Sequence, residues 1–111
     1  MEKGSTVFEK LMETIEDRKR NPPARSYTTT LLQGGVDRIG CKVMEEAAEV
    51  VRAARKAGDS GDARGHLVCE AADVLYHLFV LLGYCDVRLN EVEVELARRF
   101  GTSGLDEKTA R

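Results

Sequence analysis

The sequence contains few of the cysteine, proline and aromatic residues that stabilise many small proteins. Among its 111 residues it has no tryptophan, two prolines and 5% aromatic residues. Its three cysteines form an odd set without a C-x-x-C pair, which argues against a disulfide framework and a thiolate zinc site. We therefore expect Cys41, Cys69 and Cys85 to be reduced packing residues. A chain this short buries only roughly 60 to 70% of its unfolded surface, so we also expect help from a partner subunit.

The chain also lacks a strong charge of either sign and a long apolar run. Its 17 basic and 19 acidic residues give a net charge of −2, whereas nucleic-acid binding usually needs a basic face. The densest apolar stretch, residues 78–85, is much shorter than the roughly 20 residues that cross a bilayer. The N-terminus offers no apolar signal-peptide region. We predict a cytoplasmic protein that binds neither nucleic acid nor a membrane.

Apolar residues recur at helical spacing almost throughout the sequence. A capping box at Thr6 and Glu9 begins a first helix over about residues 6–19, and the segment Asn21-Pro22-Pro23 ends it. A polar loop follows over residues 24–30, and the Gly34-Gly35 break precedes a second helix that ends near Gly58. A glycine-rich connector over residues 58–65 then leads to a third helix over about residues 66–84. A fourth helix starts near residue 90, ends near residue 101, and is expected to turn Val92, Leu96 and Phe100 inward.

These segments predict an all-α fold, a bundle of four to five helices in a single domain over residues 1–111. The core is expected over about residues 6–100, and the polar residues 101–111 are expected to form a flexible tail.

Acidic residues gather on one side of the second helix. At 100° per residue, Lys42, Glu46 and Glu49 fall within an arc of roughly 60°, and Glu45 widens it to about 100°. Taken alone, such a face is usually solvated surface.

The third helix changes this interpretation, because Glu70, Asp73 and His77 share a narrow arc of a helix that is otherwise mostly apolar. Two helices joined by a short connector pack antiparallel, so the acids of both helices are predicted to converge. Two carboxylates at ~4 Å repel by about 4 kcal/mol at an effective dielectric constant near 20. A cation is therefore needed, and oxygen ligands favour Mg²⁺, with Mn²⁺ as an alternative ion, together with a phosphorylated substrate.

A di-iron centre is the rival chemistry for a carboxylate-bearing bundle. It needs a Glu-x-x-His element from each of two helices, which this sequence does not supply. We expect His77 to be a hydrogen-bonding residue of the bundle interior.

The segment from Arg25 to Thr30 sets a guanidinium group beside five hydroxyl groups. Such groups can hold phosphate oxygens or ribose hydroxyls. Ser26 and its neighbours can equally serve as the N-terminal cap of a short helix through Leu31 and Leu32. Lys42 can either pair with the neighbouring carboxylates or reach a phosphate.

Three motifs carry a resemblance to a known family over about residues 6–100. They are Ser26-Tyr27-Thr28, then Gly35-x-x-x-Ile39-x-x-Lys42-x-x-Glu45-Glu46-x-x-Glu49-Val50, and finally Leu67-x-x-Glu70-x-Ala72-Asp73-x-x-Tyr76-His77. In these motifs the chain resembles the phosphoribosyl-ATP pyrophosphatase family, a branch of the MazG-like all-helical nucleotide pyrophosphatases.

The resemblance implies a MazG-like bundle completed by a homodimer or a larger homo-oligomer. It implies a Mg²⁺-dependent enzyme of histidine biosynthesis that hydrolyses phosphoribosyl-ATP to phosphoribosyl-AMP and pyrophosphate. It also implies metal ligation by Glu46, Glu49, Glu70 and Asp73, with Glu45 as a further acidic residue of the site and Lys42 near the phosphates.

Our hypothesis for the reaction is that Mg²⁺ bridges the substrate phosphates and a water that attacks the α-phosphorus. Glu45 and Glu49 are both candidates for the base that takes the proton of that water. Arg25, Ser26 and Tyr27 are assigned to substrate binding. Two alternatives stay open, a house-cleaning nucleoside triphosphate pyrophosphatase and a non-enzymatic helical dimerisation module.

Overall fold

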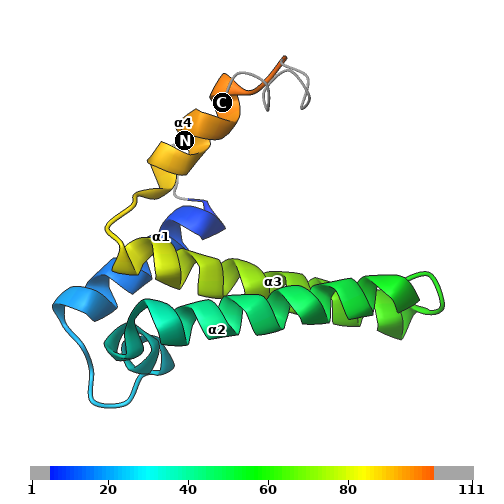
Figure 1. Ribbon diagram of the computed structural model, residues 1–111, viewed down its shortest axis with the longest axis horizontal. Coiled ribbons are helices and arrows are strands. Elements are labelled where there is room, and N and C mark those ends of the chain that lie inside the picture. Colours follow the sequence, from blue (N-terminus) through cyan, green and yellow to red (C-terminus); the bar gives the residue numbers. More distant parts are fainter. Residues whose placement is uncertain (1–5, 102–111) are drawn as a thin grey trace.

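A computed structural model describes residues 6–101, which contain four α-helices and no strand. The helices are α1 (Val7–Arg20), α2 (Tyr27–Lys56), α3 (Gly61–Tyr84) and α4 (Leu89–Arg98). Helices α2 and α3 run side by side as a long antiparallel hairpin, α1 packs near one end of it, and α4 leads away from it (Figure 1). The predicted all-α class is confirmed. The tail predicted over residues 101–111 lies, apart from Gly101, outside the described residues.

Hydroxyl caps fix where the first three helices begin. The predicted capping box of α1 is present, because Thr6 Oγ1 accepts a hydrogen bond from the Glu9 amide at 3.1 Å and Glu9 Oε1 accepts one from the Thr6 amide at 2.8 Å. Ser26 Oγ accepts from the Thr29 amide at the start of α2, also at 3.1 Å. Ser60 Oγ caps α3 in the same way. Each cap satisfies an amide that has no partner within the first turn of its helix.

The start of α2 differs from the prediction. Residues 27–30, expected in a loop, form its first turn because Ser26 caps it, which favours the capping interpretation of this segment. The predicted break at Gly34-Gly35 is a kink inside α2, where Gly35 has φ 75° and ψ −169°. A positive φ of this kind strains residues with a side chain, so glycine is required here. The kink separates a short initial segment from the part of α2 that carries the acidic residues.

The glycine-rich connector is also shorter than predicted. Helix α3 begins at Gly61, so only residues 57–60 join it to α2. Glycines lower helix propensity but do not forbid a helix, and the cap supplied by Ser60 outweighs them here. The prediction of a connector that reaches Gly65 is therefore wrong.

The core forms where α1 crosses the hairpin. It contains buried residues of α1, α2 and α3, namely Met12, Ile15, Leu31, Ile39, Phe79 and Val80. The apolar residues Phe8, Leu11, Met12 and Ile15 follow helical spacing in the sequence, and Met12 and Ile15 are buried as that spacing predicts. Phe8 is half-exposed and contacts the Phe79 ring with a centroid distance of 5.5 Å. Close approach of α1 and α3 depends on Gly83, because a Cβ atom there would lie 2.7 Å from Ile15 Cγ2.

Several apolar side chains stay outside this core. Leu96 and Phe100, which were predicted to turn inward, are 50% and 79% exposed because α4 leads away from the α2–α3 hairpin. The three cysteines are free and exposed, so the expectation that they are packing residues is wrong. Large apolar residues of α3 are exposed as well, namely Val68, Leu75 and Leu78. The sequence therefore contains more apolar surface than this single chain buries.

Helix α3 is long and apolar enough to cross a membrane by length and composition. The core helix of a soluble protein meets the same criteria. Here α3 packs against α1 and α2 and carries Glu70 and Asp73 near its middle. One helix of this kind is not sufficient to indicate a membrane protein.

The contact at Gly83 gives a test of the packing. We expect Gly83→Ala to destabilise the fold by about 1 to 3 kcal/mol, because the added methyl group overpacks the α1–α3 contact. Gly65→Ala is the matched control, since a Cβ atom at Gly65 meets nothing within 4 Å. Replacing glycine inside a helix should stabilise the protein by about 0.5 to 1 kcal/mol. Urea unfolding followed by circular dichroism measures both changes, and equal effects of the two substitutions would contradict the packing described.

Candidate metal site

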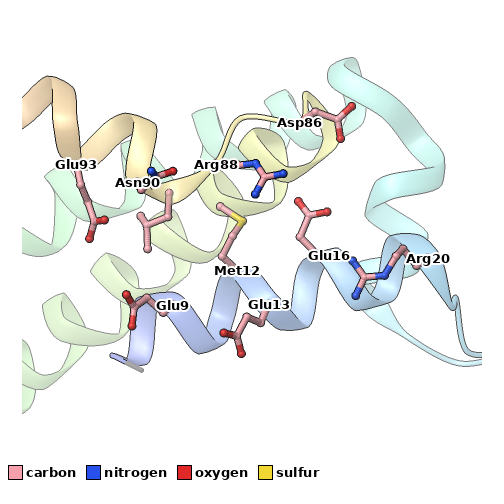
Figure 2. A pocket seen from close by; sticks show the side chains of 10 residues that line it. Glu9, Met12, Glu13, Glu16, Arg20, Asp86, Arg88, Asn90 and Glu93 are labelled. Atoms are coloured by element: carbon pink, nitrogen blue, oxygen red, sulfur yellow. The ribbon is translucent and has the colours of Figure 1, made fainter. Parts of the chain in front are cut away.

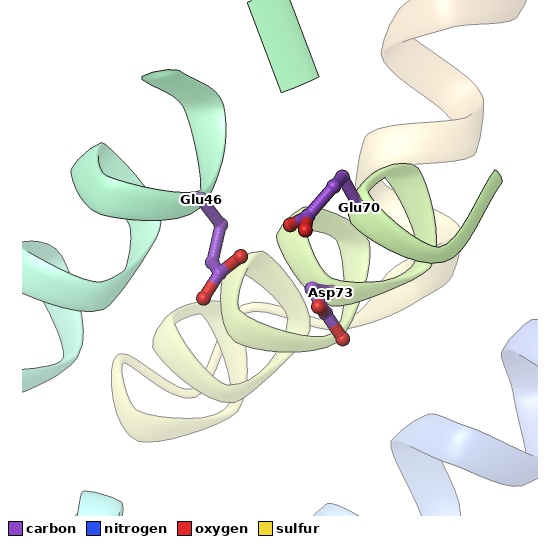
Figure 3. Close-up of side chains that lie close together, drawn as sticks. All are labelled: Glu46, Glu70 and Asp73. Carbon is purple, nitrogen blue, oxygen red and sulfur yellow. The ribbon is translucent and has the colours of Figure 1, made fainter. Parts of the chain in front are cut away.

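Three carboxylate side chains meet between α2 and α3. Glu46 comes from α2, and Glu70 and Asp73 come from α3 (Figure 3). One carboxylate oxygen of each lies within 4.8 Å of those of the other two. The side chains of Glu46 and Glu70 are only 15% and 14% exposed, whereas Asp73 is exposed. We call these three residues the carboxylate cluster.

The cluster is electrostatically unfavourable when all three groups are ionised. The pKa of Glu70 is raised, first by burial of its carboxyl group and then by the hydrogen bond and the charge of Glu46, with Asp73 adding a smaller repulsion. His66, one helical turn before Glu70 with Nε2 at 3.5 Å, acts in the opposite direction. A cation bound among the three oxygens would remove the repulsion, because it favours the ionised form of each carboxylate.

The other two predicted acids of α2 do not belong to the cluster. Glu45 lies 3.1 Å from the Lys42 ammonium group, and Glu49 lies 2.6 Å from the guanidinium group of Arg52. Both carboxylates are exposed to a much greater extent than that of Glu46. The structure thus brings together three of the five carboxylates that were predicted to converge.

Lys42 connects the two sets of acids. Its ammonium nitrogen lies 3.1 Å from Glu45 and 3.8 Å from Glu46, so the intrahelical pairing considered in the sequence analysis is present. The hydrogen bond to Glu45 is the largest cause that raises the pKa of Lys42, against a smaller effect of burial. Lys42 is therefore a fixed positive charge at the edge of the cluster.

His77 is a hydrogen-bonding residue of the interior, as predicted. It is 5% exposed, and its Nδ1 lies 2.9 Å from the backbone oxygen of Asp73. Its Nε2 lies 3.0 Å from the hydroxyl oxygen of Tyr27. Through His77, the first turn of α2 is joined to the same turn of α3 that carries Asp73.

The predicted substrate-binding segment lies at this end of α2. Ser26 caps the helix, Tyr27 is half-exposed, and Arg25 is exposed before the cap. The hydroxyl groups of Thr28 and Tyr76 are hydrogen-bonded to each other. This contact was not predicted from the sequence, since no spacing rule relates residues on different helices.

His66 was also missed. Its spacing of four residues before Glu70 is the separation at which side chains on a helix contact each other, so the sequence did contain that signal.

Two cavities of the described chain lie away from the carboxylate cluster. A groove of about 560 Å³ runs between α1 and the segment that leads into α4, with acidic residues on its α1 side (Figure 2). An apolar groove of about 390 Å³ lies among α1, α3 and α4. Neither is lined by a residue of the carboxylate cluster. The candidate site is therefore assigned by the chemistry of its side chains, of which Asp73 is exposed.

The chain is similar to known proteins over nearly its whole length. The family model for phosphoribosyl-ATP pyrophosphohydrolase matches residues 8–100. A relative from Rhodopirellula baltica is 46% identical over 94% of this chain and 85% of its own length. A relative from Geotalea daltonii is 44% identical over 95% of this chain and 94% of its own length. A third relative, from Nitrosospira multiformis, is 48% identical over 95% of this chain and 83% of its own length. All three are named phosphoribosyl-ATP pyrophosphatase.

The raised pKa of Glu70 predicts how the cluster affects stability without a divalent ion. Because the folded-state pKa lies above the ordinary value of 4.5, the folded protein binds this proton more tightly than the unfolded chain. That contribution to stability is present at low pH and is lost as the pH rises through the folded-state pKa. We expect Glu70→Gln, measured in EDTA, to have a higher Tm than the parent protein at pH 7.5 and a difference that shrinks towards pH 4.5. Glu13→Gln, at an exposed position of α1, should show no such trend. A Tm difference between Glu70→Gln and the parent protein that is the same at both pH values would contradict the electrostatic description.

Proposed function

The chain belongs to the phosphoribosyl-ATP pyrophosphohydrolase family, and we propose that the carboxylate cluster is the centre at which it carries out that family's reaction. The reaction is the hydrolysis of phosphoribosyl-ATP to phosphoribosyl-AMP and pyrophosphate in histidine biosynthesis. Water adds to the α-phosphorus, and the bond between that phosphorus and the bridging oxygen of the departing pyrophosphate breaks. We further propose that the protein acts in the cytoplasm.

The observation that carries this proposal is the set of three carboxylates within 4.8 Å of one another, two of them largely buried. Hard oxygen ligands at this density fit Mg²⁺, with Mn²⁺ as an alternative ion. Glu46, Glu70 and Asp73 would hold the metal, and Glu49 would join them by leaving its pair with Arg52. When bound, Mg²⁺ supplies Lewis-acid chemistry, since it polarises phosphate oxygens and lowers the pKa of a bound water.

The remaining roles are divided among residues around the cluster. Lys42 holds its charge beside Glu46, where it can pair with a phosphate oxygen of the substrate. Arg25 and Ser26 lie at the start of α2, where a guanidinium group and a hydroxyl group can donate to an anionic ligand. The base that accepts the proton of the attacking water must be a carboxylate that is not fully engaged with the metal, and Glu45 and Glu49 remain its two candidates.

We also propose that the bundle is completed by a second copy of the chain. The apolar groove of α1, α3 and α4 and the exposed apolar residues of α3 and α4 provide a surface for such a contact. Apolar patches of this kind mark interfaces more often than free surface.

Activity tests the proposal directly. We expect Mg²⁺-dependent pyrophosphate release from phosphoribosyl-ATP, no release in EDTA, and little release from ATP. Asp73→Asn should lower kcat by about 100-fold or more, because loss of a ligand costs both metal affinity and charge stabilisation. Asp37→Asn, at an exposed position of the same helix pair, is the matched control and should leave kcat unchanged.

Each other result of these assays has a defined meaning. Release mainly from ATP or other triphosphates would keep the metal site and favour the house-cleaning alternative. Absence of hydrolysis, together with a Tm that does not change at millimolar Mg²⁺, would favour the non-enzymatic module, because a ligand bound only to the folded state must raise the Tm.

The oligomer has a separate test. We expect sedimentation equilibrium to give at least twice the mass of 12.3 kDa that the chain itself has. Leu78→Asp should lower that mass or weaken association by at least tenfold, because it places a charge in the apolar groove. A parent protein that sediments as a single chain at micromolar concentration would refute the proposed dimer.

A further inference from the structure

The hydroxyl group of Tyr27 lies at the junction between the first turn of α2 and the carboxylate cluster. Its oxygen is 3.0 Å from His77 Nε2, and the same imidazole contacts the backbone oxygen of Asp73 through Nδ1. Tyr27 itself belongs to α2, the helix that also supplies Glu46. The phenol is therefore linked to both helices that supply the cluster.

The two contacts of His77 decide the direction of these hydrogen bonds. A backbone carbonyl oxygen can only accept, so Nδ1 carries the hydrogen that it donates to Asp73. In the neutral ring, Nε2 then presents a lone pair, and Tyr27 must donate its hydroxyl hydrogen to it. A phenol has one hydrogen, so what remains on the Tyr27 oxygen is the capacity to accept a hydrogen bond.

This direction limits which ligand groups Tyr27 can bind. Ionised phosphate oxygens only accept hydrogen bonds, so they cannot pair with a hydroxyl oxygen whose hydrogen is already donated. A sugar hydroxyl can donate to it. Of the two ligand groups considered in the sequence analysis for this segment, the ribose hydroxyl is the one that fits Tyr27.

The side chain of Tyr27 is also half-exposed and held in place. Tyr27 is 51% exposed, its ring stacks on Tyr76 with a centroid distance of 6.1 Å, and the edge-on contact with His77 has a centroid distance of 5.9 Å. The hydrogen bond between Thr28 and Tyr76 holds the adjacent residue of the same turn. A group fixed in this way loses little conformational freedom when a ligand binds.

We propose that Tyr27 is a specificity-determining residue whose hydroxyl oxygen accepts a hydrogen bond from a ribose hydroxyl of the substrate. The inference rests on the proposed function, because it takes the substrate to be a nucleotide whose phosphates lie at the carboxylate cluster. The same acceptor could receive a hydrogen bond from a water on a bound cation. Both ligands are O–H donors, and the experiment separates them.

The first part of the test removes the hydroxyl group. We expect Tyr27→Phe to raise the KM for phosphoribosyl-ATP by about tenfold and to leave kcat within about twofold, as is typical when one hydrogen bond to a bound ligand is lost. Tyr84→Phe is the matched control, since it deletes the same group at the C-terminal end of α3, where it contacts neither Tyr27 nor His77 in the structure, and should change neither constant. An unchanged KM for Tyr27→Phe would overturn the proposal.

The second part removes the donor from the substrate. Analogues of phosphoribosyl-ATP that each lack one ribose hydroxyl are compared on the parent protein and on Tyr27→Phe. One analogue should lose about tenfold in kcat/KM on the parent protein and nothing further on the variant, because both changes delete the same interaction. Losses that multiply for every analogue would overturn the proposal.

The alternative donor gives a different pattern. If Tyr27 binds a water on the cation, Tyr27→Phe should lower kcat and reduce the rise in Tm produced by Mg²⁺, and that result would overturn the ribose assignment. Failure of the proposed function is distinct from all of these outcomes, because the parent protein would then show no Mg²⁺-dependent release of pyrophosphate from phosphoribosyl-ATP.

Discussion

The antiparallel contact between α2 and α3 is the constraint on which the rest of this molecule depends. It buries apolar residues near one end of the hairpin and forces Glu46 to face Glu70 and Asp73 across the interface. Like charges at this separation oppose folding unless a proton or a cation compensates them. The same contact that stabilises the fold therefore also creates a repulsion among carboxylates. That cost is understandable if the cluster binds a metal ion.

Most polar contacts around the cluster join residues of the same helix. Lys42 faces Glu45 and Glu46, His66 faces Glu70, and His77 bonds to the backbone beside Asp73. Each of these residues lies three or four positions from its partner on the same helix, so helical geometry alone fixes it. The contacts of Tyr27 and Thr28 with α3 are different, because they join the two helices. They anchor the short segment of α2 that precedes the kink at Gly35 to the turn of α3 that follows Asp73.

A single chain leaves apolar surface exposed on α3 and α4. Its carboxylate cluster lies outside both cavities, and exposed apolar residues of α3 and α4 surround a groove that nothing in the described chain fills. Short chains bury a smaller fraction of their surface than long chains do. The second copy proposed above would cover this apolar surface, including the apolar side of α4.

The sequence by itself determined the all-α class, the start of α1, the break at Gly35 and the presence of acidic residues on the facing helices. Caps, glycines and side-chain periodicity act over a few residues, so they can be read from the sequence. It also identified His77 as an interior residue, since that histidine lies on a mostly apolar helix. Only the tertiary structure decided that three carboxylates rather than five converge. Glu45 and Glu49 pair with Lys42 and Arg52 at the i,i+3 spacing that any helix permits. Which acids of α2 also face α3 depends on the rotation and offset of the two helices. Long-range packing sets that rotation, and no local pattern encodes it.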